Sequence, residues 1–102
     1  LQNGESLQSL LAQQPFAKIV AANRIGTLAP SAPVLLYHSQ FDDVIPYAVG
    51  TQLKADWCGH GASVDFVAGV VPTHVGGMPE YDTYALPFLN KIFHGQPVTN
   101  DC

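Results

Sequence analysis

Three side chains that could perform acid–base chemistry stand just after two apolar runs of strand length. Asp42 and Asp43 follow the run over residues 34–38, and His74 follows the run over residues 63–71. If these runs are neighbouring parallel strands, both loops leave the sheet at the same edge, where open α/β sheets bind ligands. A carboxylate that accepts from one imidazole nitrogen fixes the ring's tautomer and stabilises its protonated form. The spacing therefore predicts an Asp–His pair, the acid–base half of a nucleophilic triad.

The same residues have structural interpretations. Asp42 could instead be a turn or helix-capping residue, since aspartate is common just before a helix. His74 could be an ordinary loop histidine. His38 lies inside an apolar run, where we expect a hydrogen-bonded structural group. His60 and His94 lie near expected helix C-termini, where an imidazolium is mildly favoured by the helix dipole, and we assign them no chemistry.

The surrounding pattern predicts alternating helices and strands. Leu7, Leu10 and Leu11 have the i, i+3, i+4 spacing of an amphipathic helix. A continuous apolar run without alternation, as over 34–38, indicates a strand covered on both faces. In chain order we expect helices over 6–14 and 15–23, a strand over 34–38, a helix that begins at Pro46 and ends at Gly59 and Gly61, a strand over 63–71, and a helix over 78–94 that restarts at Pro87 and ends at Gly95.

This order of elements predicts an α/β fold, a βαβ unit with parallel strands and flanking helices. Two strands alone make a poor sheet, because each leaves an edge of unpaired N–H and C=O groups. We therefore expect a single domain over residues 1–102 that forms the end of a larger α/β sheet, which either another chain completes or from which this chain is a fragment. The chain begins at Leu1 without a Met or a signal sequence, which indicates a processed product or a piece of a longer protein.

Composition excludes several classes of function. The 102 residues are 47% hydrophobic and 12% charged, which argues against intrinsic disorder. The net charge is −4, and the four cationic residues are scattered singly, so no basic patch for nucleic acid is expected. No apolar run approaches the ~20 residues that a membrane-spanning helix needs.

The two cysteines leave alternatives open. A pair of cysteines in a lysine-poor chain fits an extracellular protein with a disulfide, and closing the loop from Cys58 to Cys102 would stabilise the fold by ~3–4 kcal/mol. A metal site that adds His60, His74 and His94 is the alternative, although the spacings match no closed zinc pattern. Two free thiols are the third possibility.

Two features of the last third of the chain complete the pattern. The pair Gly76-Gly77 is too short to form a phosphate-binding loop. We expect the two glycines to make the chain flexible beside His74. The last helix carries a row of aromatic residues that we expect in the core rather than on a lipid-binding surface: Tyr81, Tyr84, Phe88 and Phe93.

A family resemblance becomes visible in the segment over 36–47. It resembles the acid loop of α/β-hydrolases, in which a strand is followed by an Asp that stands four residues before a Pro, as Asp42 stands before Pro46. Tyr47, the segment over 57–62 and Cys102 narrow the resemblance to the secreted lipases of the fungal and actinobacterial family that includes lipase A of Candida antarctica. The resemblance covers residues 16–102. The order of acid before histidine also agrees with α/β-hydrolases.

The resemblance implies a fold, an activity and roles for four residues. The chain would be the C-terminal portion of an α/β-hydrolase fold in a secreted triacylglycerol lipase or carboxylic ester hydrolase. Asp42 would be the triad acid, His74 the base, and Cys58 and Cys102 a disulfide. Asp43 is the rival acid, three residues before the proline. No cofactor or metal is implied, and the partners are an ester or lipid substrate and the remaining N-terminal part of the hydrolase.

The sequence also departs from that family. The nucleophile elbow Gly-x-Ser-x-Gly is absent, and Ser63 lacks the second glycine and precedes a strand. We therefore expect the chain to be inactive alone, with the serine in the part it lacks. Two alternatives remain, namely part of a secreted α/β-hydrolase peptidase, and a non-catalytic module that binds lipid or protein.

Overall fold

The computed structural model describes residues 4–102, so Leu1 lies outside the described residues. The elements in chain order are α1 (Leu7–Leu11), α2 (Phe16–Ala22), β1 (Val34–Ser39), α3 (Tyr47–Gly59), β2 (Val64–Gly69) and α4 (Gly77–Phe93). Every expected helix and strand is present, with ends that shift by a few residues. α1 is the shortest helix in the described residues. Ser6 caps its start by accepting the N–H of Ser9, and the helix ends at Leu11.

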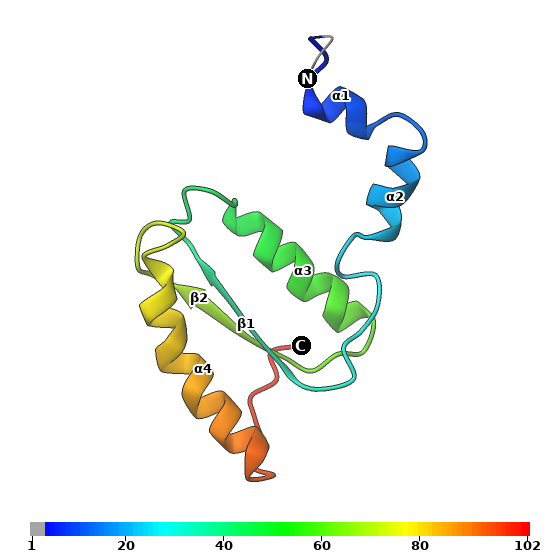
Figure 1. Cartoon of the computed structure of the whole chain (residues 1–102). Coiled ribbons are helices and arrows are strands. Elements are labelled where there is room, and N and C mark those ends of the chain that lie inside the picture. The colour runs from blue at the N-terminus through cyan, green and yellow to red at the C-terminus, as the bar shows by residue number, and fades with distance from the viewer. Residues whose placement is uncertain (1–3) are drawn as a thin grey trace.

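β1 and β2 form a two-stranded parallel sheet in the register Val34↔Val64 to Ser39↔Gly69. α3 makes the crossover between them and covers one face of the sheet, while α4 covers the other (Figure 1). Side chains of β1 alternate accordingly, with Tyr37 against α4 and His38 against α3. The predicted βαβ unit with flanking helices is confirmed.

Glycine ends the two long helices, as the sequence predicts. Gly61 has φ +86° and Gly95 has φ +64°, both in the left-handed region that glycine enters without strain. After α3, the N–H of Ala62 donates to the carbonyl of Trp57 and that of Gly61 to Cys58. This pair of bonds satisfies carbonyls that the end of a helix leaves free, and it turns the chain into β2.

Two expectations for α4 are wrong. Pro87 lies inside a continuous helix instead of restarting it, and its neighbours Ala85 and Phe88 are buried and hold the helix against the sheet. Of the aromatic row only Phe88 is buried, whereas Phe93 is 81% exposed. Burial of such a row depends on what packs against the far side of α4, which helical spacing alone does not report.

The buried core is small. Its hydrophobic members within the described residues are Ala62, Val64, Ala85 and Phe88. α1 and α2 contact each other and project away from the sheet and its two helices (Figure 1). The radius of gyration is 16.7 Å, compared with about 13 Å for a compact domain of this length. Most of the large apolar side chains in the described residues are therefore exposed, and few are buried within the chain itself.

Candidate active site

The loops that follow β1 and β2 bring Asp42 and His74 together at the carboxyl edge of the sheet. His74 Nδ1 lies 2.8 Å from Asp42 Oδ2, a hydrogen bond between residues 32 positions apart. The Asp42 side chain is 7% exposed, whereas that of His74 is 46% exposed. The acid is therefore enclosed, and the imidazole ring reaches the surface.

The chain around Asp42 holds its carboxylate in place. Oδ1 accepts the backbone N–H groups of Val44 at 2.9 Å and Ile45 at 2.8 Å, which leaves Oδ2 for His74. These contacts favour the charged form, so the pKa of Asp42 falls from 3.8 to about 2, chiefly through the Ile45 amide and then through His74. The turn that the alternative interpretation assigned to Asp42 is real, and it leaves the other oxygen free for the histidine.

Asp43 binds the same histidine at a different place. Its Oδ1 accepts the backbone N–H of His74 at 2.8 Å, while the ring is bonded to Asp42. The two neighbouring carboxylates therefore act on the main chain and on the side chain of one residue. Sequence spacing named both acids as candidates but could not divide these tasks between them.

His38 is a structural group, as expected from its place in the strand. Its Nε2 lies 3.0 Å from the carbonyl oxygen of Ile45, to which a ring N–H donates, and its ring meets Tyr47 edge-on. Sequence reasoning missed that Nε2 also lies 3.6 Å from Asp42 Oδ2. The i, i+4 spacing of His38 and Asp42 across the end of the strand is the signal that could have found this neighbour.

Ser39 ties the two loops to each other. Its hydroxyl donates to the carbonyl of Val71 at 2.7 Å and accepts the N–H of Phe41 at 3.1 Å, with 1% of the residue exposed. A second bond runs from the N–H of Thr73 to the carbonyl of Phe41. Nothing in the sequence predicts this role, because a serine at a strand end is common and its partner lies 32 residues away.

The loop over 70–76 is closely packed. Thr73 has φ 70°, a conformation that is unfavourable for a β-branched residue. Its hydroxyl accepts the N–H of Gly76 at 2.9 Å, and a Cβ on Gly76 would lie 2.7 Å from that same oxygen. The structure needs the small size of Gly76 and Gly77, and that they make the chain flexible beside His74 stays a prediction.

A hollow of about 340 Å³ opens beside the Asp42–His74 pair. Its apolar walls include Ile45, Met78 and Tyr81. Among the described residues His74 Nε2 has no hydrogen-bond partner. A group seated in the hollow could therefore reach the free nitrogen of the histidine.

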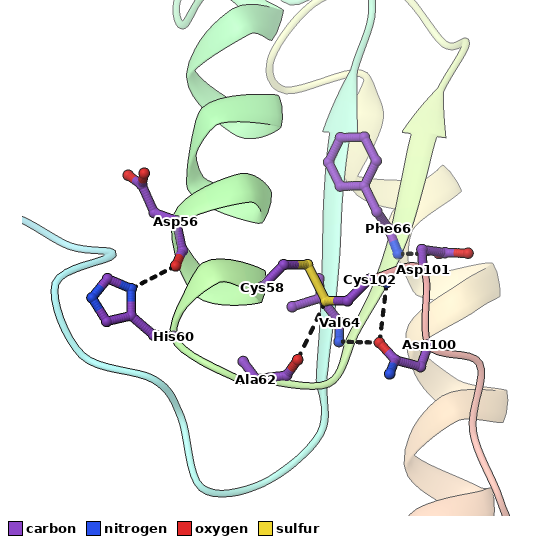
Figure 2. Close-up of a disulfide and its surroundings, with 9 residues drawn as sticks. All are labelled: Asp56, Cys58, His60, Ala62, Val64, Phe66, Asn100, Asp101 and Cys102. Atoms are coloured by element: carbon purple, nitrogen blue, oxygen red, sulfur yellow. Dashed lines mark hydrogen bonds between the residues drawn. A yellow bond between two sulfur atoms is a disulfide. The ribbon is translucent and has the colours of Figure 1, made fainter.

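The two cysteines form a disulfide across the opposite end of the sheet. Cys58, near the end of α3, is bonded to Cys102 in the C-terminal tail, with the Cα atoms 5.4 Å apart (Figure 2). This excludes both the free thiols and a metal site with cysteine thiolates as ligands. Throughout residues 4–102, no group of three or more His, Cys, Asp or Glu side chains is placed to hold a metal ion.

His60 and His94 lie where the helix ends predict. Their Nδ1 atoms lie 2.7 Å and 2.8 Å from carbonyl oxygens of the preceding turn.

In the described part of the chain, no helix has the length and apolarity needed to cross a bilayer.

The fold and the site define a class of protein, an α/β chain with an Asp–His pair at the carboxyl edge of a parallel sheet. The model of the secretory lipase family matches residues 1–101, and the chain belongs to this family.

Three curated relatives illustrate the similarity. The secreted triacylglycerol lipase LIP7 of Malassezia globosa is 34% identical over 76% of this chain and 17% of the relative. The secreted triacylglycerol lipase LIP5 of Malassezia furfur is 40% identical over 67% of this chain and 18% of the relative. Lipase 10 of Candida albicans is 29% identical over 91% of this chain and 21% of the relative. The chain thus spans about a fifth of the length of these relatives. No solved structure matches it significantly.

Proposed function

We propose that this chain is the C-terminal part of the α/β-hydrolase domain of a secreted triacylglycerol lipase, and that it supplies the acid and the base of a Ser–His–Asp triad. Asp42 is the acid and His74 the base. The observation that carries the proposal is the 2.8 Å bond between His74 Nδ1 and Asp42 Oδ2 at the carboxyl edge of the sheet. The names of the relatives support the substrate class and the secreted location.

The geometry of the pair suits proton transfer during acyl transfer. With Nδ1–H donated to Asp42, His74 keeps the lone pair of Nε2 free to take the proton of a serine hydroxyl as that serine attacks an ester carbonyl. The imidazolium that forms is stabilised by the Asp42 carboxylate and returns the proton to the leaving alcohol. Water then attacks the acyl-enzyme by the same route. The pKa of Asp42, at about 2, keeps it ionised throughout.

The free edge of β1 supports the place of this chain in a larger sheet. Within residues 4–102, β2 is the one strand that pairs with β1, so the other edge of β1 carries no strand. The unpaired N–H and C=O groups of such an open edge can pair with a further strand. We propose that residues 1–102 belong to one domain with the rest of the lipase, which brings the serine and the oxyanion donors to His74.

Mutation of the longer lipase that contains this chain tests the proposal. We expect His74→Ala to abolish hydrolysis of a triacylglycerol emulsion and of a short-chain chromogenic ester. Asp82→Asn is the matched control, because Asp82 is exposed on α4 and makes no hydrogen bond or ion pair among the described residues. Full activity of His74→Ala would contradict the proposal. Hydrolysis of peptides in place of esters would support the peptidase alternative.

A further inference from the structure

Glu80, in the first turn of α4, accepts hydrogen bonds from three donor groups in other parts of the fold. Its Oε2 accepts the hydroxyl of Tyr37 at 2.6 Å and the backbone N–H groups of Val70 and Val71, each at 3.0 Å. The donors come from β1 and from the residues that directly follow β2. One carboxylate therefore joins three elements that are distant in sequence.

These contacts close the loop that carries His74. The loop begins at Val70 and ends where α4 begins at Gly77, so Glu80 binds the start of the loop from a position one turn beyond its end. The three donors favour the ionised carboxylate and lower the pKa of Glu80. The result is a fixed distance between the two ends of a short segment.

Tyr37 fixes the same unit to β1. A Cβ on Gly77 would lie 2.9 Å from the Tyr37 hydroxyl oxygen, so the phenol packs directly against the first residue of α4. Its ring also meets Tyr81 edge-on at 6.0 Å. Because β1 leads directly into the loop of Asp42, the Glu80–Tyr37 bond relates the helix after His74 to the strand before Asp42.

The loop needs support of this kind. Thr73, next to His74, is held at φ 70°, and such backbone strain persists only where the surroundings impose it. Among residues 4–102, the hydrogen bonds to His74 itself come from Asp42 and Asp43. At the start of the loop, Val71 is held through its carbonyl by Ser39 and through its N–H by Glu80, so loss of Glu80 would remove one of these two contacts.

We propose that Glu80, through Tyr37 and the amides of Val70 and Val71, is a positioning residue that sets the place of His74 relative to Asp42. The inference rests on the triad roles proposed above. Glu80 does not line the hollow beside the pair, so its removal should not take away a substrate contact.

The test compares variants of the longer lipase in steady-state kinetics. Glu80→Gln keeps the size of the side chain but removes its charge, and it leaves one acceptor oxygen with an NH2 in place of the oxygen that also faces the Val70 N–H. We expect kcat to fall about 10- to 100-fold, because a displacement near 1 Å at a catalytic group costs on that order. KM should change less than about twofold. Asp82→Asn, two residues along the same helix with the same change of charge, should leave kcat unchanged.

A second variant keeps the proposal testable if Glu80→Gln folds poorly. Tyr37→Phe removes one donor and leaves the amides bound, so a smaller loss of kcat, about threefold to tenfold, is expected. The Glu80→Gln/Tyr37→Phe double variant should lose less than the product of the two single effects, since both act through one unit.

A spectroscopic readout separates positioning from general stability. The proton between His74 Nδ1 and Asp42 Oδ2 should give a downfield proton resonance in the wild-type protein and in Asp82→Asn. It should be broadened or lost in Glu80→Gln. Equal kcat and an intact resonance in Glu80→Gln and Asp82→Asn would overturn the inference. Full activity of His74→Ala would overturn the proposed function itself.

Discussion

At the amino end of β2 the backbone is held by the C-terminal tail, whereas beyond its carboxyl end it is held by Glu80. In the tail, Asp101 accepts the N–H of Phe66 at 2.7 Å and donates its own N–H to Val64, and Asn100 accepts the N–H of Val64 at 3.2 Å (Figure 2). At each end, a carboxylate accepts hydrogen bonds from backbone N–H groups of the strand or of the loop that follows it.

The two ends differ in what else depends on them. The amino end carries the disulfide and no group with proposed chemistry, so its contacts serve the stability of the fold. The carboxyl end carries Asp42 and His74 on strained or tightly bonded loops. Changes at the carboxyl end should therefore alter rates, and changes at the amino end should alter the free energy of unfolding.

The largest expected effect lies at the carboxyl end. In the longer lipase proposed above, Asp42→Asn should lower kcat by about 10³- to 10⁴-fold, because an amide disfavours the imidazole tautomer that leaves Nε2 free. Asp43→Asn should cost less than about tenfold, since the amide oxygen can still accept the N–H of His74. Steady-state kinetics decide the ranking, and the reverse order would assign the acid to Asp43.

The isolated chain gives a related test. A chain with the proposed acid and base but no nucleophile elbow should show no turnover of a chromogenic ester above buffer. Turnover that survives repurification and disappears in His74→Ala would contradict this and require a nucleophile within residues 1–102.

At the amino end, we expect the disulfide to make the largest contribution to the free energy of unfolding. Replacing Cys58 and Cys102 by serine should lower the free energy of unfolding by ~3–4 kcal/mol and leave kcat of the folded lipase unchanged. Denaturant titration measures the first quantity. Intact mass after thiol alkylation without reductant checks the bond itself, and two alkylated cysteines would contradict it.

Asp101 should contribute less. Asp101→Ala removes the acceptor of the Phe66 amide and should lower the free energy of unfolding by about 1 kcal/mol, again without a change in kcat. Asp82→Ala is the matched control for loss of an acidic side chain. A loss of kcat in Asp101→Ala would break the division between the two ends.

The smallest effect concerns Tyr37. Burial, and then the bond to Glu80, raises the pKa of Tyr37 from 10.0 to about 12. A raised pKa means that the contribution of Tyr37 to stability is present below about pH 10 and is lost as the pH rises through about 12. Tyrosinate absorbance at about pH 11 should therefore be lower in the wild-type protein than in Glu80→Gln, and equal absorbance would contradict the Glu80–Tyr37 bond.

The sequence predicted most of the fold because its signals are local. The apolar run over 34–38, the helix-ending glycines and the order of elements are sufficient to specify a parallel βαβ unit. The proximity of Asp42 and His74 also follows, since both stand just after the strands. The cysteine pair left three possibilities, and only the structure excluded two of them.

The hydrogen bonds that hold the two loops of the site in place could not be predicted from local sequence signals. Asp43, Ser39 and Glu80 each act on a backbone group 10 to 32 residues away, and such partners depend on how two loops lie against each other. The sequence around Thr73 does not predict its positive φ angle. The exposure of Phe93 depends on packing outside α4.

The disulfide also has a consequence for survival among proteases. Because Cys58 and Cys102 are 44 residues apart, the bond makes a covalent ring that contains β2, the loop of His74 and α4. A single peptide-bond cleavage anywhere between the two cysteines opens this ring without releasing a fragment. In a secreted protein, a nicked chain would keep its histidine attached, and contacts such as those of Glu80 could re-form around the cut.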